Sequence, residues 1–240
     1  MPSSSRIKSV SEFISTVERR AIETRRIYLF RGQCDNFKLL PGIARPHLFS
    51  YSKLETERRI LDDFKANSIP YLKILPKTDL EYLVIAQHYG VPTRLLDWTE
   101  NALAALYFAV SGAPTNNMEP EVVVCSFPNN SDLIIRDYDI DIFEQKEVKF
   151  LKPNSLVDRI TSQSGWFSMH PQTGNNSGYY IQVDKISDND MRFSKIKIDP
   201  VFANNIYKTL NDCGINKFSI FKDLDALGAY LTSKYQGFRK

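Results

Sequence analysis

Three short stretches of the sequence place arginine, amide or acidic side chains beside glycine or within apolar runs. They are YLFRGQ (Tyr28–Gln33), AQHYGVPTRLLDWTENALAALYFAV (Ala86–Val110) and RITSQSGWF (Arg159–Phe167). Burying a polar group without a partner costs about 1–3 kcal/mol, and more when the group is charged. Each stretch therefore predicts that its polar side chains have either a partner within the protein or a ligand.

The first and third stretches each combine a polar side chain with glycine at a strand end. Arg31 closes an apolar strand, so its guanidinium points either to solvent, where it pairs with a carboxylate, or into a cleft. Gly32 follows and allows a ligand or another backbone to approach closely. Gln163 lies just before Gly165, in a plain turn or a second polar spot that leads into a strand.

The central stretch holds its polar residues close together in otherwise apolar sequence: Gln87, His88, Arg94, Asp97 and Trp98. Two interpretations stay open. Arg94 and Asp97, three residues apart around a turn, can pair with each other in a structural hub. Alternatively, a buried arginine and the N-terminus of the following helix can form a site for an anionic ligand.

The rest of the chain supplies the elements that position these residues. Helical spacing is expected from Val10 to Ala21, Leu54 to Phe64, Leu80 to Gln87, a Thr99 cap to Val110, Pro200 to Asp212 and Asp223 to Tyr235. Strands are expected at Ile27–Arg31, EVVVCSF, Val148–Leu151, Trp166–Met169, YYIQVDKI and FSKIKID. The fold class is α+β: a helical N-terminal half, a mainly β second half forming a sheet, continuous or split and flanked by helices, and two closing helices.

Composition narrows the function classes. The 240 residues are 42% hydrophobic with a net charge of +3, and the basic and acidic residues are mixed along the chain. This mild charge argues against nucleic-acid binding without excluding it. The three cysteines and three histidines are scattered, so no metal site is expected. No apolar stretch reaches the roughly 18 residues of a membrane helix and the N-terminus lacks a signal-peptide core, so a cytoplasmic protein without membrane partners is expected.

The three stretches together resemble the FRG domain, a bacterial and phage-associated family named for its Phe/Tyr-Arg-Gly motif. That motif is Phe30-Arg31-Gly32 here, and HYGVPTRLLDWT matches the most specific part of the family pattern. The resemblance covers about residues 27–167, and Gly214–Leu231 resembles the C-terminal end of the family. It implies a single FRG-like domain over residues 1–240.

The FRG pattern is in turn similar, more weakly, to ADP-ribosyltransferases, which carry an Arg or His on the first core strand of a split sheet. The similarity implies NAD as substrate and no metal. It assigns catalytic roles to Arg31, His88, Asp97 and Gln163, and cofactor contacts to Arg31, Gly32, Gln33, Arg94 and Tyr107. Arg31 would hold the ribose or pyrophosphate, Gly32 the nicotinamide amide, Arg94 a phosphate, and Tyr107 would stack on nicotinamide.

One departure from that pattern concerns the acid. Such transferases place a Glu on a late strand, whereas the late matched position here is Gln163, and Asp97 would have to supply the charge that balances the oxocarbenium-like state. His88 is the candidate acid or base.

Two functions from different classes follow. The first is cleavage of the nicotinamide–ribose bond with transfer of ADP-ribose to an unknown macromolecule or to water, as an antiphage or toxin effector. The alternative is a non-catalytic sensor module of a defence system that binds a nucleotide or a protein.

Overall fold

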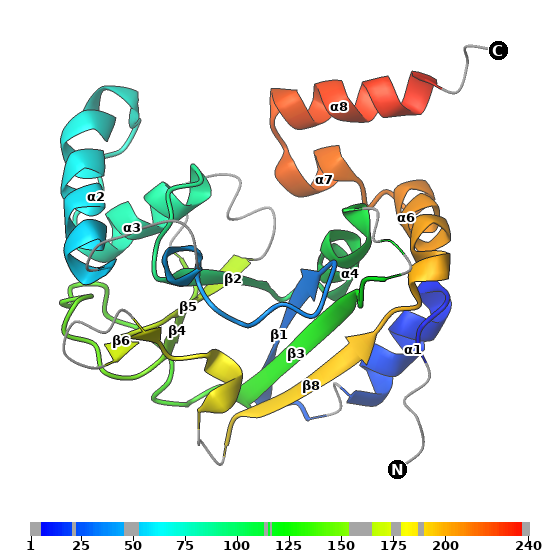
Figure 1. The fold of residues 1–240 in the computed structure, drawn as a ribbon, viewed down its shortest axis with the longest axis horizontal. Helices are drawn as coiled ribbons and strands as arrows, with labels where there is room; N and C mark the ends of the chain where they lie inside the picture. Colours follow the sequence, from blue (N-terminus) through cyan, green and yellow to red (C-terminus); the bar gives the residue numbers. More distant parts are fainter. Residues whose placement is uncertain are drawn as a thin grey trace.

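The computed structural model describes residues 6–20, 23–45, 53–112, 115, 117–153, 165–173, 179–186 and 190–236 (Figure 1). Its α-helices are α1 (Val10–Arg20), α2 (Lys53–Ser68), α3 (Asp79–His88), α4 (Ala102–Ser111), α6 (Ala203–Asp212), α7 (Lys217–Phe221) and α8 (Leu224–Tyr235). Its strands are β1 (Arg26–Gln33), β2 (Leu95–Thr99), β3 (Glu121–Pro128), β4 (Lys149–Leu151), β5 (Gly165–Met169), β6 (Gln172–Thr173), β7 (Tyr179–Tyr180) and β8 (Arg192–Lys197). The predicted α+β class is confirmed.

Six strands form one antiparallel sheet in the order β4-β5-β2-β1-β3-β8. β1 pairs with β3 along its whole length, and β2 pairs with β5 along its whole length. Between β1 and β2, by contrast, the described strands are joined through a single pair, Phe30 and Thr99. The sheet is therefore close to splitting in its middle.

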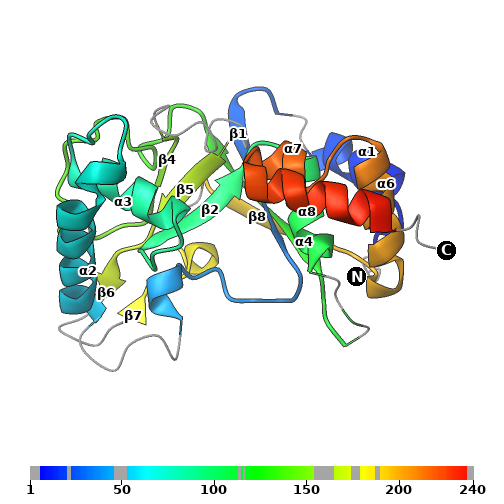
Figure 2. The same cartoon turned by 90° about the horizontal axis from the view of Figure 1, so that it is seen from above.

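Two groups of helices cover the same face of this sheet. Side chains of paired residues in neighbouring strands lie on one face, and Phe30 packs with α4 in a core that also includes α1 and α6. Leu95 lies on the same face as Thr99 and packs with α3 and α2 in a second core. Figure 2 shows the two helix groups at opposite ends of the sheet. The line where β1 and β2 diverge lies between them.

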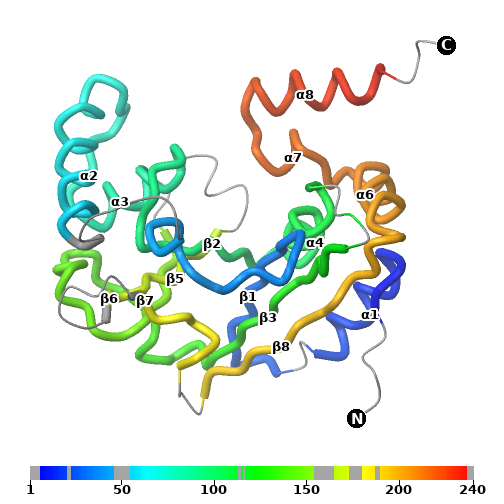
Figure 3. Tube along the Cα trace, in the orientation of Figure 1, coloured from blue at the N-terminus to red at the C-terminus, as the bar shows by residue number. Residues whose placement is uncertain are grey.

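Loops and a 3₁₀ helix cover the opposite face. Leu39, from the segment after β1, packs there with Trp98 and Phe127, and Val183 joins them from the 3₁₀ helix η3 (Val183–Lys185). The tube in Figure 3 follows the chain from β1 across to η1 (Gly42–Ala44), where the Ile43 N–H donates to the Thr93 carbonyl at 3.1 Å. This segment ties the two halves of the sheet together.

Three local predictions need correction. Thr99 does not cap a helix: it ends β2, and Asn101 caps α4 by accepting from the Leu103 and Ala104 N–H groups. The strand expected over YYIQVDKI is short, because only Tyr179–Tyr180 pairs, with β6. The two predicted closing helices are present as α6 and α8, but the short helix α7 stands between them.

Gly32 is required by packing against α4. A Cβ built on Gly32 would lie 1.8 Å from the Ala105 carbonyl oxygen and 2.7 Å from the Ala109 nitrogen. The backbone of α4 therefore rests directly on β1, and the alanines of that helix allow the approach. Of the two partners expected for Gly32, a ligand or another backbone, the backbone is present.

We expect Gly32→Ala to lower the free energy of unfolding by about 3 kcal/mol or more, at the upper end of overpacking costs, because both clashing atoms belong to backbone. Gly42→Ala is the matched control, since its Cβ would come no closer than 3.5 Å to Pro92. Urea unfolding of both variants measures the difference. Equal stabilities would contradict the packing argument.

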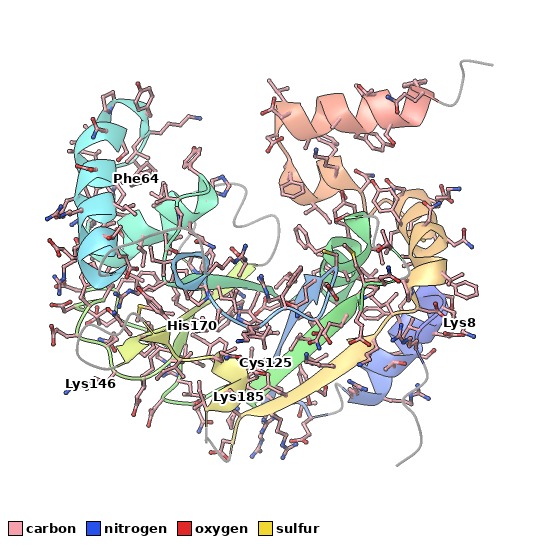
Figure 4. All side chains as sticks on the ribbon, in the orientation of Figure 1. Lys8, Phe64, Cys125, Lys146, His170 and Lys185 are labelled. Atoms are coloured by element: carbon pink, nitrogen blue, oxygen red, sulfur yellow. The ribbon has the colours of Figure 1, made fainter. Side chains whose placement is uncertain are left out.

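A directed chain of hydrogen bonds links β2, β5 and the loop after β7 on the loop-covered face. The indole N–H of Trp98 donates to Ser168 Oγ at 2.9 Å, and Ser168 Oγ lies 2.8 Å from His170 Nε2. His170 Nδ1 lies 2.6 Å from the Ile181 carbonyl oxygen, which can only accept, so Nδ1 carries the proton. His170 (labelled in Figure 4) is thus neutral and held in one tautomer.

Burial lowers the pKa of His170 to about 4, the hydrogen bond to Ile181 opposes this shift, and the charge of Arg31 adds to it. Between about pH 6.5 and 4 the unfolded chain therefore binds a proton that the folded chain does not. We expect the free energy of unfolding to fall across this window by up to about 3 kcal/mol from this group. Urea unfolding at several pH values should show a weaker decline for His170→Asn; parallel curves for the two proteins would exclude this origin.

Candidate functional site

A cavity of about 330 Å³ lies where β1 and β2 diverge. Its walls come from both helix groups and from both strands: Phe30, Arg31, Gly32, Gln87, His88, Asp97, Trp98, Thr99, Phe108 and Phe221. Four of the residues predicted as site residues, Arg31, Gly32, His88 and Asp97, thus meet in one hollow. The single pair between Phe30 and Thr99 leaves the space that they surround.

Arg31 spans the divergence between the two strands. Its Nη1 donates to the Asp97 carbonyl oxygen at 2.8 Å and lies 3.8 Å from Asp97 Oδ2. Its Nε is buried and has no hydrogen-bond partner among the described residues. Burial lowers the pKa of Arg31, the Asp97 carboxylate opposes this shift, and Arg45 adds to it. Guanidinium remains charged at neutral pH nonetheless, so Arg31 brings a positive charge to the cavity wall.

The Asp97 carboxylate is oriented by a relay of polar groups. The Leu95 N–H donates to Thr93 Oγ1 at 3.1 Å, and the Thr93 hydroxyl donates to Gln87 Oε1 at 2.7 Å. The Gln87 amide must then turn its NH₂ group to Asp97, whose two carboxylate oxygens lie 3.3 and 3.2 Å away. Although 60% of the Asp97 side chain is exposed, the carboxylate has one preferred orientation.

Aromatic rings and His88 complete the cavity. Phe108 of α4 and Phe221 of α7 meet edge to face at 5.9 Å between ring centroids. His88 ends α3 and stands edge to face with Tyr89 at 5.0 Å. The cavity therefore combines one cation, one anion, an amide and an imidazole with apolar rings, which suits a ligand with both a flat ring and polar groups.

Arg94 is a structural residue, and the expectation that it pairs with Asp97 or faces the ligand is wrong. Its side chain is fully buried, and its Nε and Nη2 donate to Glu57 Oε1 and Oε2 at 2.9 and 2.7 Å. The Arg94 N–H and the Tyr180 hydroxyl also donate to Glu57, both at 3.1 Å. Asp97 has other partners, Gln87 and Arg31, so Arg94 and Asp97 do not pair.

Three further predicted site residues do not line the cavity. Tyr107 is buried in the core of α4 and contacts Tyr207 of α6, with ring centroids 5.7 Å apart, so it does not stack on a ligand there. Gln33 is buried and donates to Glu121 Oε1 at 2.9 Å and to the Phe37 carbonyl. Gln163 lies outside the described residues.

Several cavity residues were not predicted as site residues. Gln87 stood among the polar residues of the central stretch, which was the available signal. Phe108 and Phe221 carried none, because a phenylalanine in a helix is usually core. Within the described ranges, no group of three or more His, Cys, Asp or Glu side chains could hold a metal ion, and no helix is long and apolar enough to cross a membrane.

Comparison with known families places this site within a recognised segment. Residues 26–118, less than half of the chain, match the family model of the FRG domain, and the predicted resemblance to that family is confirmed over this segment. The matched segment runs from β1 through α4 and contains the polar residues of the cavity. The resemblance of residues 214–231 to the end of the family stays a prediction. Searches of curated proteins and of solved structures find no match.

We expect Arg94→Met to lower the free energy of unfolding by about 3–5 kcal/mol, because it leaves the Glu57 carboxylate, 1% exposed, as a buried charge without its cation. Arg31→Met is the matched comparison: Asp97 keeps access to water, so the loss should be smaller, about 1–2 kcal/mol. Urea unfolding distinguishes the two arginines. A smaller loss for Arg94→Met than for Arg31→Met would reverse these assignments.

Proposed function

We propose that this chain binds NAD or a related dinucleotide in the cavity and cleaves its nicotinamide–ribose bond, transferring ADP-ribose to an acceptor. The observation that supports the proposal best is the convergence of Arg31, Gly32, His88 and Asp97 on one cavity at the point where the sheet nearly splits. The weak similarity of the FRG pattern to ADP-ribosyltransferases supports the same reaction. The split position fits the sheet expected for those enzymes.

The volume of the cavity suits one end of a dinucleotide. Ligand pockets usually measure about 300–1,000 Å³, and 330 Å³ is at the small end of that range. In the proposed complex the nicotinamide lies against Phe108 and Phe221 and the ribose against Asp97. The adjoining phosphate lies beside the Arg31 guanidinium, since guanidinium is well suited to phosphate oxygens.

Asp97 takes the part of the missing late glutamate. As the bond from ribose C1′ to nicotinamide nitrogen breaks, nicotinamide leaves with both bonding electrons and positive charge develops on the ribose. A carboxylate held beside the ring stabilises that charge. An acceptor hydroxyl or water then forms the new bond to C1′ and releases a proton, for which His88 is the candidate base.

The pairing of Asp97 supports the alternative function, binding without turnover. The carboxylate already lies near the Arg31 guanidinium and accepts from Gln87. A carboxylate whose charge is compensated in this way stabilises a cationic intermediate less. A sensor module would use the same cavity to hold a nucleotide and report its presence to a partner.

We expect the full chain, incubated with NAD, to release free nicotinamide, which chromatography measures. Asp97→Asn keeps the shape of the side chain and loses its charge. The variant should still bind NAD, and its rate of nicotinamide release should fall by about a hundredfold or more. Asp212→Asn, at the exposed end of α6 and outside the cavity lining, is the matched control and should behave as the parent does.

Two outcomes would change the assignment. NAD binding by calorimetry without nicotinamide release in the parent chain would favour the sensor function. Absence of both binding and release would reject NAD as the ligand.

A further inference from the structure

A groove with apolar walls opens between the C-terminal end of α2 and the end of α3. It measures about 440 Å³ and is lined by Phe64, Asn67, Ser68, Tyr71, Leu72 and Tyr89; we call it the α2–α3 groove. Figure 4 labels Phe64 between the two helices. Tyr71 is 85% exposed, and Ile69, Ile74 and Leu75 beside it are exposed as well. So many exposed large apolar side chains in one loop mark a surface that another element covers.

A second apolar surface runs along α8. Leu224, Leu231 and Tyr235 are spaced by seven and four residues, so they lie on one face of the helix, and all three are exposed; we call them the α8 stripe. Leu224 is 83% exposed, and Ala226 is the buried residue of α8. Helices of about 12–15 residues are marginal without tertiary packing. The stripe therefore has apolar area that association would bury.

Charge makes the two surfaces complementary. Lys73 follows Leu72 directly in the groove loop and Lys77 lies in the same loop, and within the described part of the chain neither side chain is near enough to a carboxylate to form an ion pair. Leu224 lies between Asp223 and Asp225 at the start of α8. An apolar groove edged by lysines thus fits an apolar ridge edged by aspartates.

The placement of the two surfaces fits a second copy of the chain. Figures 1 and 2 show α2 with α3 and α7 with α8 at opposite ends of the molecule, rising on the same side of the sheet. A two-fold axis passing between the two ends brings the stripe of each copy to the groove of the other. Both contacts then form together, and the assembly closes as a dimer.

We propose that this chain forms a symmetric homodimer in which Leu224 of each copy enters the α2–α3 groove of the other, with Lys73 and Asp225 facing across the contact. This proposal does not rest on the NAD reaction, although both surfaces flank the cavity: Tyr89 follows His88, and Leu224 lies three residues after Phe221. The association requires the native groove and stripe alone.

Sedimentation equilibrium of the full chain over a wide concentration range should give the dimer mass. Leu224→Asp should raise the dimer dissociation constant by about a hundredfold, because the change enters both symmetric contacts. Aspartate in the first turn of a helix is favourable, so the fold is kept. Val201→Asp, at another exposed apolar side chain outside both surfaces, is the matched control and should leave the dimer intact.

Mixing experiments test the pairing itself. Tyr71→Asp breaks the groove and Leu224→Asp breaks the stripe, so an equimolar mixture keeps one intact contact and should associate more tightly than either variant alone. Lys73→Glu and Asp225→Lys should each weaken the dimer, and the double variant should recover it.

A monomer at every concentration would overturn the proposal, as would an open series of larger assemblies. A mass unchanged by Leu224→Asp alongside a shifted melting temperature would mean that the stripe docks within its own chain, which also contradicts a dimer. If the mixture of Tyr71→Asp and Leu224→Asp associates no more tightly than either variant alone, groove meets groove or stripe meets stripe, which contradicts the proposed pairing.

Discussion

The divergence of β1 and β2 is the constraint on which the rest of this structure depends. The two strands meet through Phe30 and Thr99 and then separate, and the Arg31 guanidinium reaches the Asp97 carbonyl oxygen where a ladder hydrogen bond would otherwise continue. The separation places α3 and α4 on one face with space between them. The cavity, the exposed Asp97 carboxylate and the aromatic wall all follow from that space.

Two arginines hold β2 at two points, and they differ in burial and in role. Arg94, just before the strand, is fully buried and binds the β2 start to α2 through Glu57. Arg31 reaches the middle of β2 from the neighbouring strand and keeps a donor unused. Burial separates the two arginines: the Glu57 carboxylate that Arg94 binds is buried and also accepts from Tyr180 of β7, whereas the Asp97 carboxylate beside Arg31 faces water. A buried ion pair serves the fold, and a half-exposed one is available for chemistry.

Sequence periodicity predicted most elements of the fold, since α1, α3, β3 and β8 carry clear helical or strand patterns. It missed β2, because LLDWT is short, carries an aspartate and joins two helices. Of the predicted site residues, Arg31, Gly32, His88 and Asp97 line one cavity, and their roles stay predictions. Arg94 could not be assigned correctly, since its partner Glu57 is 37 residues away and only the packed structure brings them together. Phe108 and Phe221 could not be predicted either, because the sequence pattern of an apolar residue is the same whether it fills a core or lines a cavity.

A ladder joined through one residue pair offers little resistance to rotation about that pair. Mechanical compliance is therefore concentrated along the line between β1 and β2, while each half of the sheet, with its full ladders to β3 and β5, stays stiff. A change in the width of the hollow between α3 and α4 would therefore have to be accommodated on the loop-covered face, where Leu29, Trp98 and Phe127 pack together across this line. Within the described sheet, the ladder is thus thinnest at the floor of the cavity, and packing on the opposite face holds the two halves together there.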